Sequence, residues 1–399
     1  MQLVEQHIVK KTSPFYKELS NALWRSKNLY NSTTYAVRQY YFQNRKYLSY
    51  YQVQNLFQTS HQPDYEALPR KVSQQTMRMV DQNFRSFFAS IKSSKVKNPK
   101  LPHYLKKDGK FLLTYTSQAV SAKELKNKGV VVPSGLNVAI PTKVKFEELN
   151  QVRVVPRLDY IVVEVVYTVN EKPLKADNGR YAAIDLGIDN LATLASNIDG
   201  LQPLIISGKK VKSTNHYYNK HLAKAKSLLE KRNKGQKSSK RTRKLTLKRN
   251  NKIKDYLHKA SKSIVNQLVS NDITTLVVGK NDGWKQDTNL GRKNNQNFVQ
   301  IPFNLFVSML VYKCKLQGIT VLQQEESYTS KCSFLDGESI CKHKSYVGSR
   351  IHRGLFKTAS GLLINADVNG SLNILRKCKP KAFADGVQGV VVHPRVVSL

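Results

Sequence analysis

Residues 181–193 read Tyr-Ala-Ala-Ile-Asp-Leu-Gly-Ile-Asp-Asn-Leu-Ala-Thr, and the fold is best worked out from this stretch. Its composition is that of a buried strand, interrupted by one carboxylate at Asp185 and turned at Gly187. A charge on the central strand of a core is costly unless it is paired or coordinates a metal. We therefore interpret Asp185 as a ligand at the open end of a strand. The alternative is a turn or cap residue, the usual role of a lone Asp after an apolar run.

Two further stretches carry carboxylates in comparable positions. Residues 318–327 predict a strand that ends in Glu325 and Glu326, and residues 365–373 place Asp367 at the opening of a short helix. Three separated carboxylates on one scaffold suit a pair of Mg²⁺ ions, which take oxygen ligands and drive in-line attack on phosphodiesters.

The charge of the chain indicates a polyanionic partner. Among 399 residues, 66 Lys and Arg oppose 27 Asp and Glu, which gives a formal net charge of +39. Such an excess would make a compact domain repel itself, and nucleic acid is the simplest partner to neutralise it. The 20 Tyr residues strengthen this interpretation, because Tyr and Arg stack on bases and bond phosphates.

The length allows two or three domains, and the composition predicts a cytoplasmic protein. No apolar run approaches the roughly 20 residues that span a bilayer. The N-terminus lacks the basic and apolar regions of a signal peptide. The cysteines fit a reducing compartment and are too few for a disulfide scaffold; they are Cys314, Cys332, Cys341 and Cys378.

The predicted elements run strand, helices, strands, and then an α/β layer. Residues 2–9 alternate as a strand does, a helix is predicted over about 71–94, and residues 99–169 form short alternating runs broken by Gly and Pro. From residue 181 onward strands alternate with helices, which predicts a site at the carboxyl ends of the strands. The solvent side of the 71–94 helix is a candidate nucleic-acid surface, with Arg70, Lys71, Arg78 and Arg85.

Residues 209–270 predict a basic helical hairpin. Between residues 209 and 262 only Glu230 and Asp255 oppose about twenty Lys and Arg. A charge run is usually a solvated face, but one this lopsided predicts phosphate contacts and salt-sensitive affinity. The candidate contacts on the hairpin are Lys231, Arg232, Lys240, Arg241, Arg243, Lys244 and Arg249.

These motifs, in this order, resemble the split RuvC nuclease of TnpB. TnpB is an RNA-guided endonuclease of insertion sequences, formerly called OrfB transposase, and is related to type V CRISPR effectors. The matching motifs are Asp-Leu-Gly-Ile at 185–188, Asn-Leu-Ala-Thr at 190–193, Tyr-Thr-Ser-Lys at 328–331 and Asn-Ala-Asp-Val-Asn at 365–369. The resemblance is strong over residues 173–377 and rests mostly on layout in the N-terminal part.

The resemblance implies an α/β RNase H-like (RuvC) nuclease domain and an N-terminal β-barrel wedge domain that carries an inserted helical recognition domain. The boundaries that follow are 1–12 and 99–172 for the wedge, 13–98 for the recognition domain, 173–377 for the nuclease, and 329–364 for a degenerate zinc-ribbon region within it. Residues 378–399 are left as a C-terminal tail, and its many Val and Gly residues predict loose order.

The second acid departs from the pattern of many TnpB relatives, which have a Glu at the end of the strand matching residues 274–279. Gly279 stands there in this chain. Either the nuclease is inactive, or the neighbouring strand supplies the acid. We favour Glu326, because some relatives have a Glu directly before their Tyr-Thr-Ser-Lys element; Glu325 is the fallback, since alternation sends the two acids to opposite faces. Weaker candidates, each more typical of a turn, are Asp189, Asp282 and Asp336.

Many relatives also carry a four-Cys zinc ribbon between the second and third acids. This chain has no CxxC pair, and structural zinc ligands normally lie two to four residues apart in pairs. We therefore expect no zinc, and a short basic loop and hairpin at 342–357 in its place. The weak candidate ligands are Cys332, Cys341 and His343, with His352 beyond them.

The resemblance implies Mg²⁺-dependent hydrolysis of a DNA phosphodiester, with Asp185, Glu326 and Asp367 holding two ions about 4 Å apart. A guide RNA from the element's end would pair with the target strand, while the protein, a monomer on one RNA, reads a short motif on double-stranded DNA. Such a protein would act at the nucleoid of a prokaryotic cell. Three alternatives remain open: a nuclease-dead RNA-guided repressor, a DNA-transesterifying transposase, and a purely structural RNA-binding protein with no need for Asp185.

Overall fold

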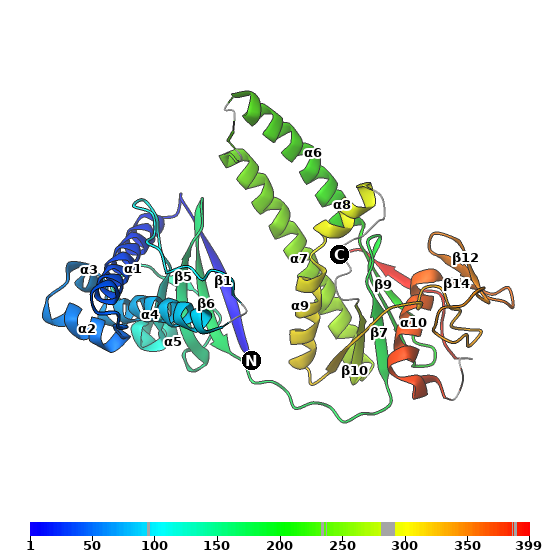
Figure 1. The fold of residues 1–399 in the computed structure, drawn as a ribbon. Coiled ribbons are helices and arrows are strands. Elements are labelled where there is room, and N and C mark those ends of the chain that lie inside the picture. The colour runs from blue at the N-terminus through cyan, green and yellow to red at the C-terminus, as the bar shows by residue number, and fades with distance from the viewer. Residues whose placement is uncertain (94–95, 233–234, 237, 281–291, 385, 387–388) are drawn as a thin grey trace. The chain divides into compact units, whose positions relative to one another are not determined.

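The chain forms two compact units in the computed structural model (Figure 1), Met1–Asn170 and Glu171–Leu399. No helix in the described part of the chain is both long and apolar enough to cross a lipid bilayer. The structure describes residues 1–93, 96–232, 235–236, 238–280, 292–384, 386 and 389–399.

The first unit is built on a four-stranded antiparallel sheet in the order β1-β6-β5-β2. Its strands are β1 (Gln2–Lys10), β2 (Leu113–Thr116), β5 (Leu149–Pro156) and β6 (Tyr160–Thr168). β1 pairs with β6 along its whole length, so the first and last strands of the unit are neighbours. A separate ladder joins β3 (Val130–Val131) to β4 (Ile140–Pro141). Closure of these strands into a wedge-type barrel stays a prediction.

The helices of the first unit share one core with this sheet. On α4, Val72, Val80 and Phe84 form a buried stripe, whereas Arg78 and Arg85 on the other side are exposed. This is the pattern of an amphipathic helix whose basic side faces solvent. The helices between β1 and β2 are α1 (Tyr16–Asn44), α2 (Tyr50–Thr59), α3 (Pro63–Glu66) and α4 (Arg70–Lys92). The short elements after β2 are η1 (Ser117–Ala119), α5 (Ala122–Lys128) and η2 (Phe146–Glu148).

The second unit contains a six-stranded mixed sheet in the order β11-β10-β7-β8-β9-β15. β10 is parallel to both of its neighbours, β7 and β11, while β8 is antiparallel to β7 and β9. The strands are β7 (Tyr181–Asp185), β8 (Asn190–Ser196), β9 (Leu204–Ser207), β10 (Thr275–Gly279), β11 (Thr320–Gln324) and β15 (Arg395–Val397).

The C-terminal residues take part in this sheet, so the expectation of a loosely ordered tail is wrong. β15 pairs in parallel with β9, with Val396 opposite Ile205. A single turn, η3 (Pro380–Phe383), follows the last long helix. The edge of β9 offers unpaired backbone groups that an added strand can satisfy. A strand of three residues is too short for its alternation to be recognised in the sequence.

Helices cover both faces of the second sheet, which explains why the inner strands β8 and β10 are buried almost throughout. Ala182 and Ile184 of β7 pack into the core that includes α7 and α9, whereas Ala183 packs with Ile374 of α10. Because alternate residues of a strand face opposite ways, Asp185 belongs to the α10 face. α6 packs along α7 as a hairpin. The helices are α6 (Lys209–Arg232), α7 (Lys240–Ser270), α8 (Arg292–Gln300), α9 (Phe303–Lys315) and α10 (Ala366–Cys378).

Residues 329–364 form a lobe beside α10. It contains a three-stranded antiparallel sheet made of β12 (Ser349–His352), β13 (Leu355–Lys357) and β14 (Leu363–Asn365). β14 ends where α10 begins, so the lobe leads directly into the helix that carries Asp367.

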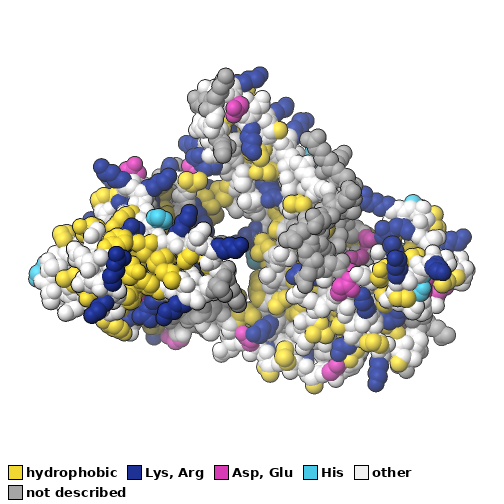
Figure 2. Space-filling view, in the orientation of Figure 1, with side chains coloured by type: hydrophobic (Ala, Val, Ile, Leu, Met, Phe, Trp, Pro, Cys, Tyr) yellow, Lys and Arg dark blue, Asp and Glu magenta, His cyan; other side chains and the backbone are white. Residues whose placement is uncertain are grey.

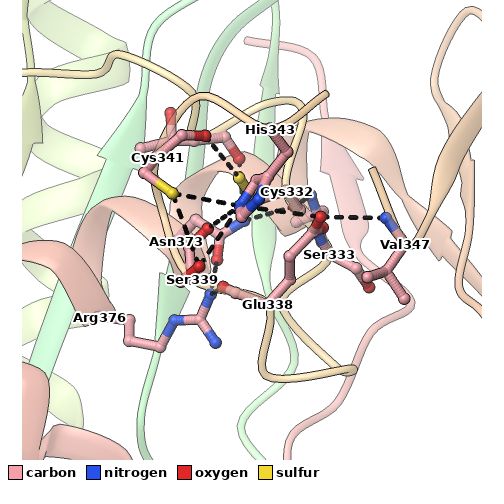
Figure 3. A network of polar contacts seen from close by, with 11 residues as sticks. Cys332, Ser333, Glu338, Ser339, Cys341, His343, Val347, Asn373 and Arg376 are labelled. Carbon is pink, nitrogen blue, oxygen red and sulfur yellow. Dashed lines mark hydrogen bonds and ion pairs between the residues drawn. The ribbon is translucent and has the colours of Figure 1, made fainter. Parts of the chain in front are cut away.

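A polar network fixes the loop that opens the lobe (Figure 3). The buried carboxylate of Glu338 accepts hydrogen bonds from the backbone N–H groups of Ser333 (2.7 Å) and Val347 (3.0 Å). Arg376 of α10 donates to the Glu338 carbonyl oxygen at 2.5 Å and to Asn373 Oδ1 at 2.9 Å. Asn373 in turn donates to the carbonyl oxygen of Cys332 at 2.8 Å. Side chains of α10 and one acid therefore satisfy the buried backbone of this loop.

Substitution Glu338→Ala is expected to lower the melting temperature of the chain by about 5 °C or more. It removes the acceptor for two backbone N–H groups, and each buried group left unsatisfied costs about 1–3 kcal/mol. Calorimetry of the full chain measures the change. The control is Asp255→Ala, which breaks only an exposed pair with Lys259 on α7 and should move the melting temperature by about 1 °C or less. Equal melting of the two variants would contradict this role of Glu338.

Candidate active site

Three carboxylates from distant parts of the chain converge on the α10 side of the second sheet. Asp185 is the last residue of β7, Glu326 lies two residues beyond β11, and Asp367 is in the first turn of α10. β7 and β11 are both parallel to β10, so their carboxyl ends meet at one edge of the sheet. α10 packs closely against β7: a Cβ added at Gly370 would lie only 2.9 Å from Asp185 Oδ2.

The pKa of Asp185 reflects this convergence. Burial raises the pKa of its carboxyl well above the usual range, and the negative charges of Glu326 and Asp367 raise it further. The positive charge of Arg350 acts in the opposite direction without offsetting them. The charges of Glu326 and Asp367 therefore both reach Asp185, and this crowding of acids disfavours the ionised form of its carboxyl group.

Glu325 and Glu326 point to different surroundings. The Glu325 carboxylate is exposed and bonds to Lys377 Nζ at 2.6 Å and to the backbone N–H of Ser327 at 2.7 Å. These hydrogen bonds lower the pKa of Glu325. Burial, followed by repulsion from Glu325, raises the pKa of Glu326 to about 7. Glu326, not Glu325, is thus the acid that is coupled to Asp185.

Gly279 makes room for the Glu326 carboxyl group. β10 pairs with β11 so that Gly279 lies opposite Gln324, two residues before Glu326. A Cβ at Gly279 would overlap Glu326 Oε1 and would lie 2.6 Å from Ile374 Cδ1. The side chain of Glu326 therefore fills the space above the position where, in the pattern of many relatives, a Glu is found.

The Asp367 carboxylate is held by two polar side chains. Asn190 Nδ2 donates to its Oδ2 at 2.6 Å, and Arg350 Nη2 lies 3.5 Å from its Oδ1. Asn365 caps α10 by accepting from the backbone N–H of Asp367 at 3.0 Å. Within the described ranges, no three Asp, Glu, His or Cys side chains lie in a ready-made metal-binding arrangement.

The weaker acid candidates are engaged in other contacts. Asp189, in the β7–β8 turn, pairs with Lys212 at 2.6 Å and with Arg353. Although partial burial raises the pKa of Asp189, these two cations lower it below the usual value. Asp336 accepts a hydrogen bond from the backbone N–H of Ala359 at 2.9 Å. Asp282 lies outside the described residues.

The basic candidates on α4 are exposed, and some already have aromatic or acidic neighbours. The Arg78 guanidinium stacks over the Tyr50 ring, with 4.5 Å to the centroid. Arg85 pairs with Asp81 at 2.7 Å. These contacts leave the α4 surface basic while fixing two of its side chains. Arg70 and Lys71 are exposed as well.

On the hairpin, most of the candidates are exposed, and Figure 2 shows Lys and Arg side chains along it. Arg249 differs, because its guanidinium donates to Asn215 Oδ1 at 2.8 Å and to the carbonyl oxygen of Gln300 at 2.6 Å. It holds α7 to α6 and to the end of α8. Arg243 is half-buried. The exposed candidates are Lys231, Arg232, Lys240, Arg241 and Lys244.

Sequence reasoning missed a set of basic residues beside Asp367. They line a pocket of about 1050 Å³, together with the β7–β8 turn. None of the predicted nucleic-acid residues lines this pocket. The only signal in the sequence was the density of Lys and Arg at the start of the hairpin and in residues 350–353. The missed residues are Lys209, Lys212, His216, Lys220, Arg350 and Arg353.

The weak zinc candidates lie near one another in the loop of Figure 3. Cys341 Sγ is 3.4 Å from His343 Nε2, and His343 Nε2 is 2.7 Å from the carbonyl oxygen of Ser339. Cys332 is buried and its Sγ is 3.8 Å from the carbonyl oxygen of Cys341. His352 is exposed on β12. The Cys341 and His343 side chains also contact Ser339 Oγ, and the His343 ring packs edge-on against Tyr346.

Comparison with known proteins points to one family. Residues 164–285, which include Asp185, match the family model of a probable transposase, OrfB of the IS605 type. Residues 303–374, which include Glu326 and Asp367, match the TNB domain of Cas12f1-like proteins. The TnpB-like protein ORF457 of Acidianus two-tailed virus is 24% identical over 242 residues, which are 56% of this chain and 48% of that protein. The matched region thus spans about half the length of this curated relative.

The fold has a counterpart among solved structures. A Cas12f1 protein, determined in complex with sgRNA and target DNA, aligns with 90% of this chain and 83% of its own. The TM-score is 0.54 at 15% sequence identity, which shows a shared fold. Together with the two family models and the curated relative, it confirms the resemblance that the motifs predict, to TnpB-type proteins and the related type V effectors.

Proposed function

We propose that the chain is an RNA-guided DNA endonuclease of an insertion sequence, with Asp185, Glu326 and Asp367 as its catalytic acids. The observation that carries this proposal is the convergence of three carboxyl groups from three separate segments. A Cβ at Gly370 of α10 would lie 2.9 Å from Asp185 Oδ2, and the charges of Glu326 and Asp367 add to burial in raising the pKa of Asp185. A purely structural RNA-binding protein would have no use for such a group.

The donor set fits Mg²⁺. All three side chains offer carboxylate oxygens, the ligands that this ion prefers, and their mutual repulsion is what a divalent cation relieves. When bound, Mg²⁺ lowers the pKa of a water molecule and neutralises charge on the leaving 3′ oxygen. The residues of the chain would position these groups: Asn190 orients the Asp367 carboxylate, and Gly279 leaves space for the carboxyl of Glu326.

The partners we propose are a guide RNA and double-stranded target DNA, bound by one copy of the chain. The net charge of +39 and the exposed cations of the hairpin and α4 support contacts with phosphate backbones. A relative with the same fold was determined with sgRNA and target DNA. Base pairing would then supply the sequence recognition, and the protein would grip the duplex by its backbone.

A nuclease-dead, RNA-guided DNA-binding protein is the second candidate, because Gly279 lacks the acid found in many relatives. The carboxyl group of Glu326 lies over Gly279, which supports a relocated acid and not a lost one. A transposase that joins DNA ends would need no RNA, so its activity would survive ribonuclease treatment.

Substitution Glu326→Gln is expected to reduce guide-dependent DNA cleavage at least about 100-fold, because it removes one charged ligand from the group. Glu325→Gln is the matched control, since Glu325 bonds to Lys377 and is exposed; cleavage should stay within about threefold of the unchanged chain. The measurement uses the protein purified with its own RNA and a plasmid bearing the matching target. RNA retention should be equal in both variants. Full cleavage by Glu326→Gln would refute the assignment of this acid.

Substitution Gly279→Ala is expected to slow cleavage about tenfold or more, because the new methyl group overlaps Glu326 Oε1 and displaces the carboxylate. The atoms in its way are the ends of flexible side chains, so the melting temperature should change by about 3 °C or less. Single-turnover cleavage and calorimetry on the same preparation separate the two effects. Unchanged cleavage would mean that the position of Glu326 does not matter.

The thermal stability of the chain without divalent ions is expected to fall as the pH rises through about 7. Burial raises the pKa of Glu326 to about 7 in the folded protein, so the folded state favours the protonated acid. The resulting stabilisation is complete below pH 4.5 and is lost above pH 7. Melting curves between pH 5.5 and about 8.5, with EDTA or Mg²⁺, measure the change. Mg²⁺ should stabilise the chain more at the higher pH, and Glu326→Gln should reduce this dependence, while Asp185, whose pKa is also raised, keeps part of it.

A further inference from the structure

The pocket beside Asp367 is lined mainly by three segments of the second unit, with Gln296 of α8 in addition. The β7–β8 turn contributes residues 187–190, the first turns of α6 contribute residues between 209 and 220, and the β12–β13 hairpin contributes residues 350–354. Its volume of about 1050 Å³ is at the upper end of the range for ligand pockets. The pocket therefore has room for a stretch of polymer next to one of the three acids.

The charge of the lining is positive. Five Lys and Arg side chains and one His face two carboxylates, Asp189 and Asp367. Each of the two acids already pairs with a cation of the lining: Asp367 with Arg350, and Asp189 with Lys212 and Arg353. The formal surplus of positive charge suits a polyanion, and the phosphate backbone of one nucleic-acid strand is the polymer that the acids would act on.

Asp189 ties the three segments together across this pocket. Lys212 Nζ of α6 donates to Asp189 Oδ1 at 2.6 Å, and Arg353, from the turn between β12 and β13, pairs with Oδ2. The backbone of the β7–β8 turn is also bonded to the residue that precedes α6: Gly208 N–H donates to the Asp189 carbonyl oxygen at 2.7 Å. The side chain of Arg353 is otherwise mostly exposed, at 71%, so Asp189 is what directs it toward the pocket.

We propose that Lys212 and Arg353 form a phosphate-binding subsite for the backbone of the strand to be cut, and that Asp189 is the positioning residue that holds both cations for it. This inference rests on the proposed nuclease function. A guanidinium group has five N–H donors, so Arg353 can pair with Asp189 and still donate to a phosphate. Holding two long side chains in place before binding also reduces the conformational entropy that binding would cost.

A purely repulsive role of Asp189 predicts the opposite change in affinity for a polyanion. If Asp189 is only an acid near a basic pocket, it repels phosphate, and its neutralisation should strengthen binding of a polyanion. If it positions the cations, Asp189→Asn should weaken binding even though the net charge of the protein rises. A binding measurement distinguishes the two without any cleavage.

The experiment titrates the full chain with a fluorescent single-stranded hexathymidylate in EDTA and follows hydrogen exchange of the same mixture by mass spectrometry. We expect the oligonucleotide to protect backbone amides around residues 209–216 and 349–354. Asp189→Asn should weaken binding about three- to tenfold and abolish protection of 349–354, while Asp189→Glu should restore part of both. The double substitution Lys212→Gln/Arg353→Gln should remove protection of both segments.

The matched control is Asp177→Asn, which removes a carboxylate that pairs with Lys379 outside the pocket. It should leave the protection pattern unchanged. Tighter binding by Asp189→Asn, or protection that persists in the double variant, would overturn the subsite. Because these readouts need no cleavage, failure of the chain to cut any DNA would count against the proposed function and leave the subsite standing.

Discussion

Three carboxyl groups are held together at the end of a buried sheet, and the rest of the second unit is arranged around that constraint. Asp185 lies at the end of the central strand, where burial already raises its pKa, and Glu326 and Asp367 add their repulsion. A hydrophobic residue at any of these positions would be easier to fold around. The second unit nevertheless covers the sheet with helices on both faces and leaves the three acids, each half-buried, at its open edge.

Glycines at two positions make this crowding possible. Gly370 lets α10 approach β7 until the helix backbone touches the Asp185 carboxylate, and Gly279 leaves a gap on β10 that Glu326 fills from the next strand. An acid on β10 would need the same space, so the presence of Gly279 and the position of the Glu326 side chain depend on each other. At this point the sheet thus has room for a side chain from only one of two adjacent parallel strands.

The parts of this arrangement that could be predicted are local. A carboxylate that ends an apolar run marks Asp185, and the cap at Asn365 marks the start of the helix that carries Asp367. Strand alternation separates Glu325 from Glu326, but the sequence did not decide between them on physical grounds alone. The deciding contact is with Lys377, which draws Glu325 outward from a position 52 residues away.

Long-range contacts of short or exposed segments could not be predicted. The three residues of β15 have no readable alternation, and only the edge of β9 makes them a strand. Arg249 lies in the same Lys- and Arg-rich sequence as its exposed neighbours, yet Asn215 and Gln300 accept hydrogen bonds from its guanidinium inside the unit. Arg350 and Arg353 looked like parts of a basic loop, because the acids they pair with precede or follow them at distances that no local pattern reveals.

The basic residues of the second unit therefore fall into two groups with different physical properties. On the hairpin, exposed side chains such as Lys231 and Lys244 present charge over a long surface and keep their rotamer freedom. They suit binding that ignores sequence and position and that weakens steeply with salt. In the pocket, Lys212, Arg350 and Arg353 are each held by a carboxylate, which lowers their net attraction for phosphate but fixes where they stand. Charge that is partly neutralised and well positioned binds phosphate less tightly but places it more accurately. The proposed cleavage needs such placement, because one phosphodiester bond must lie against the acids.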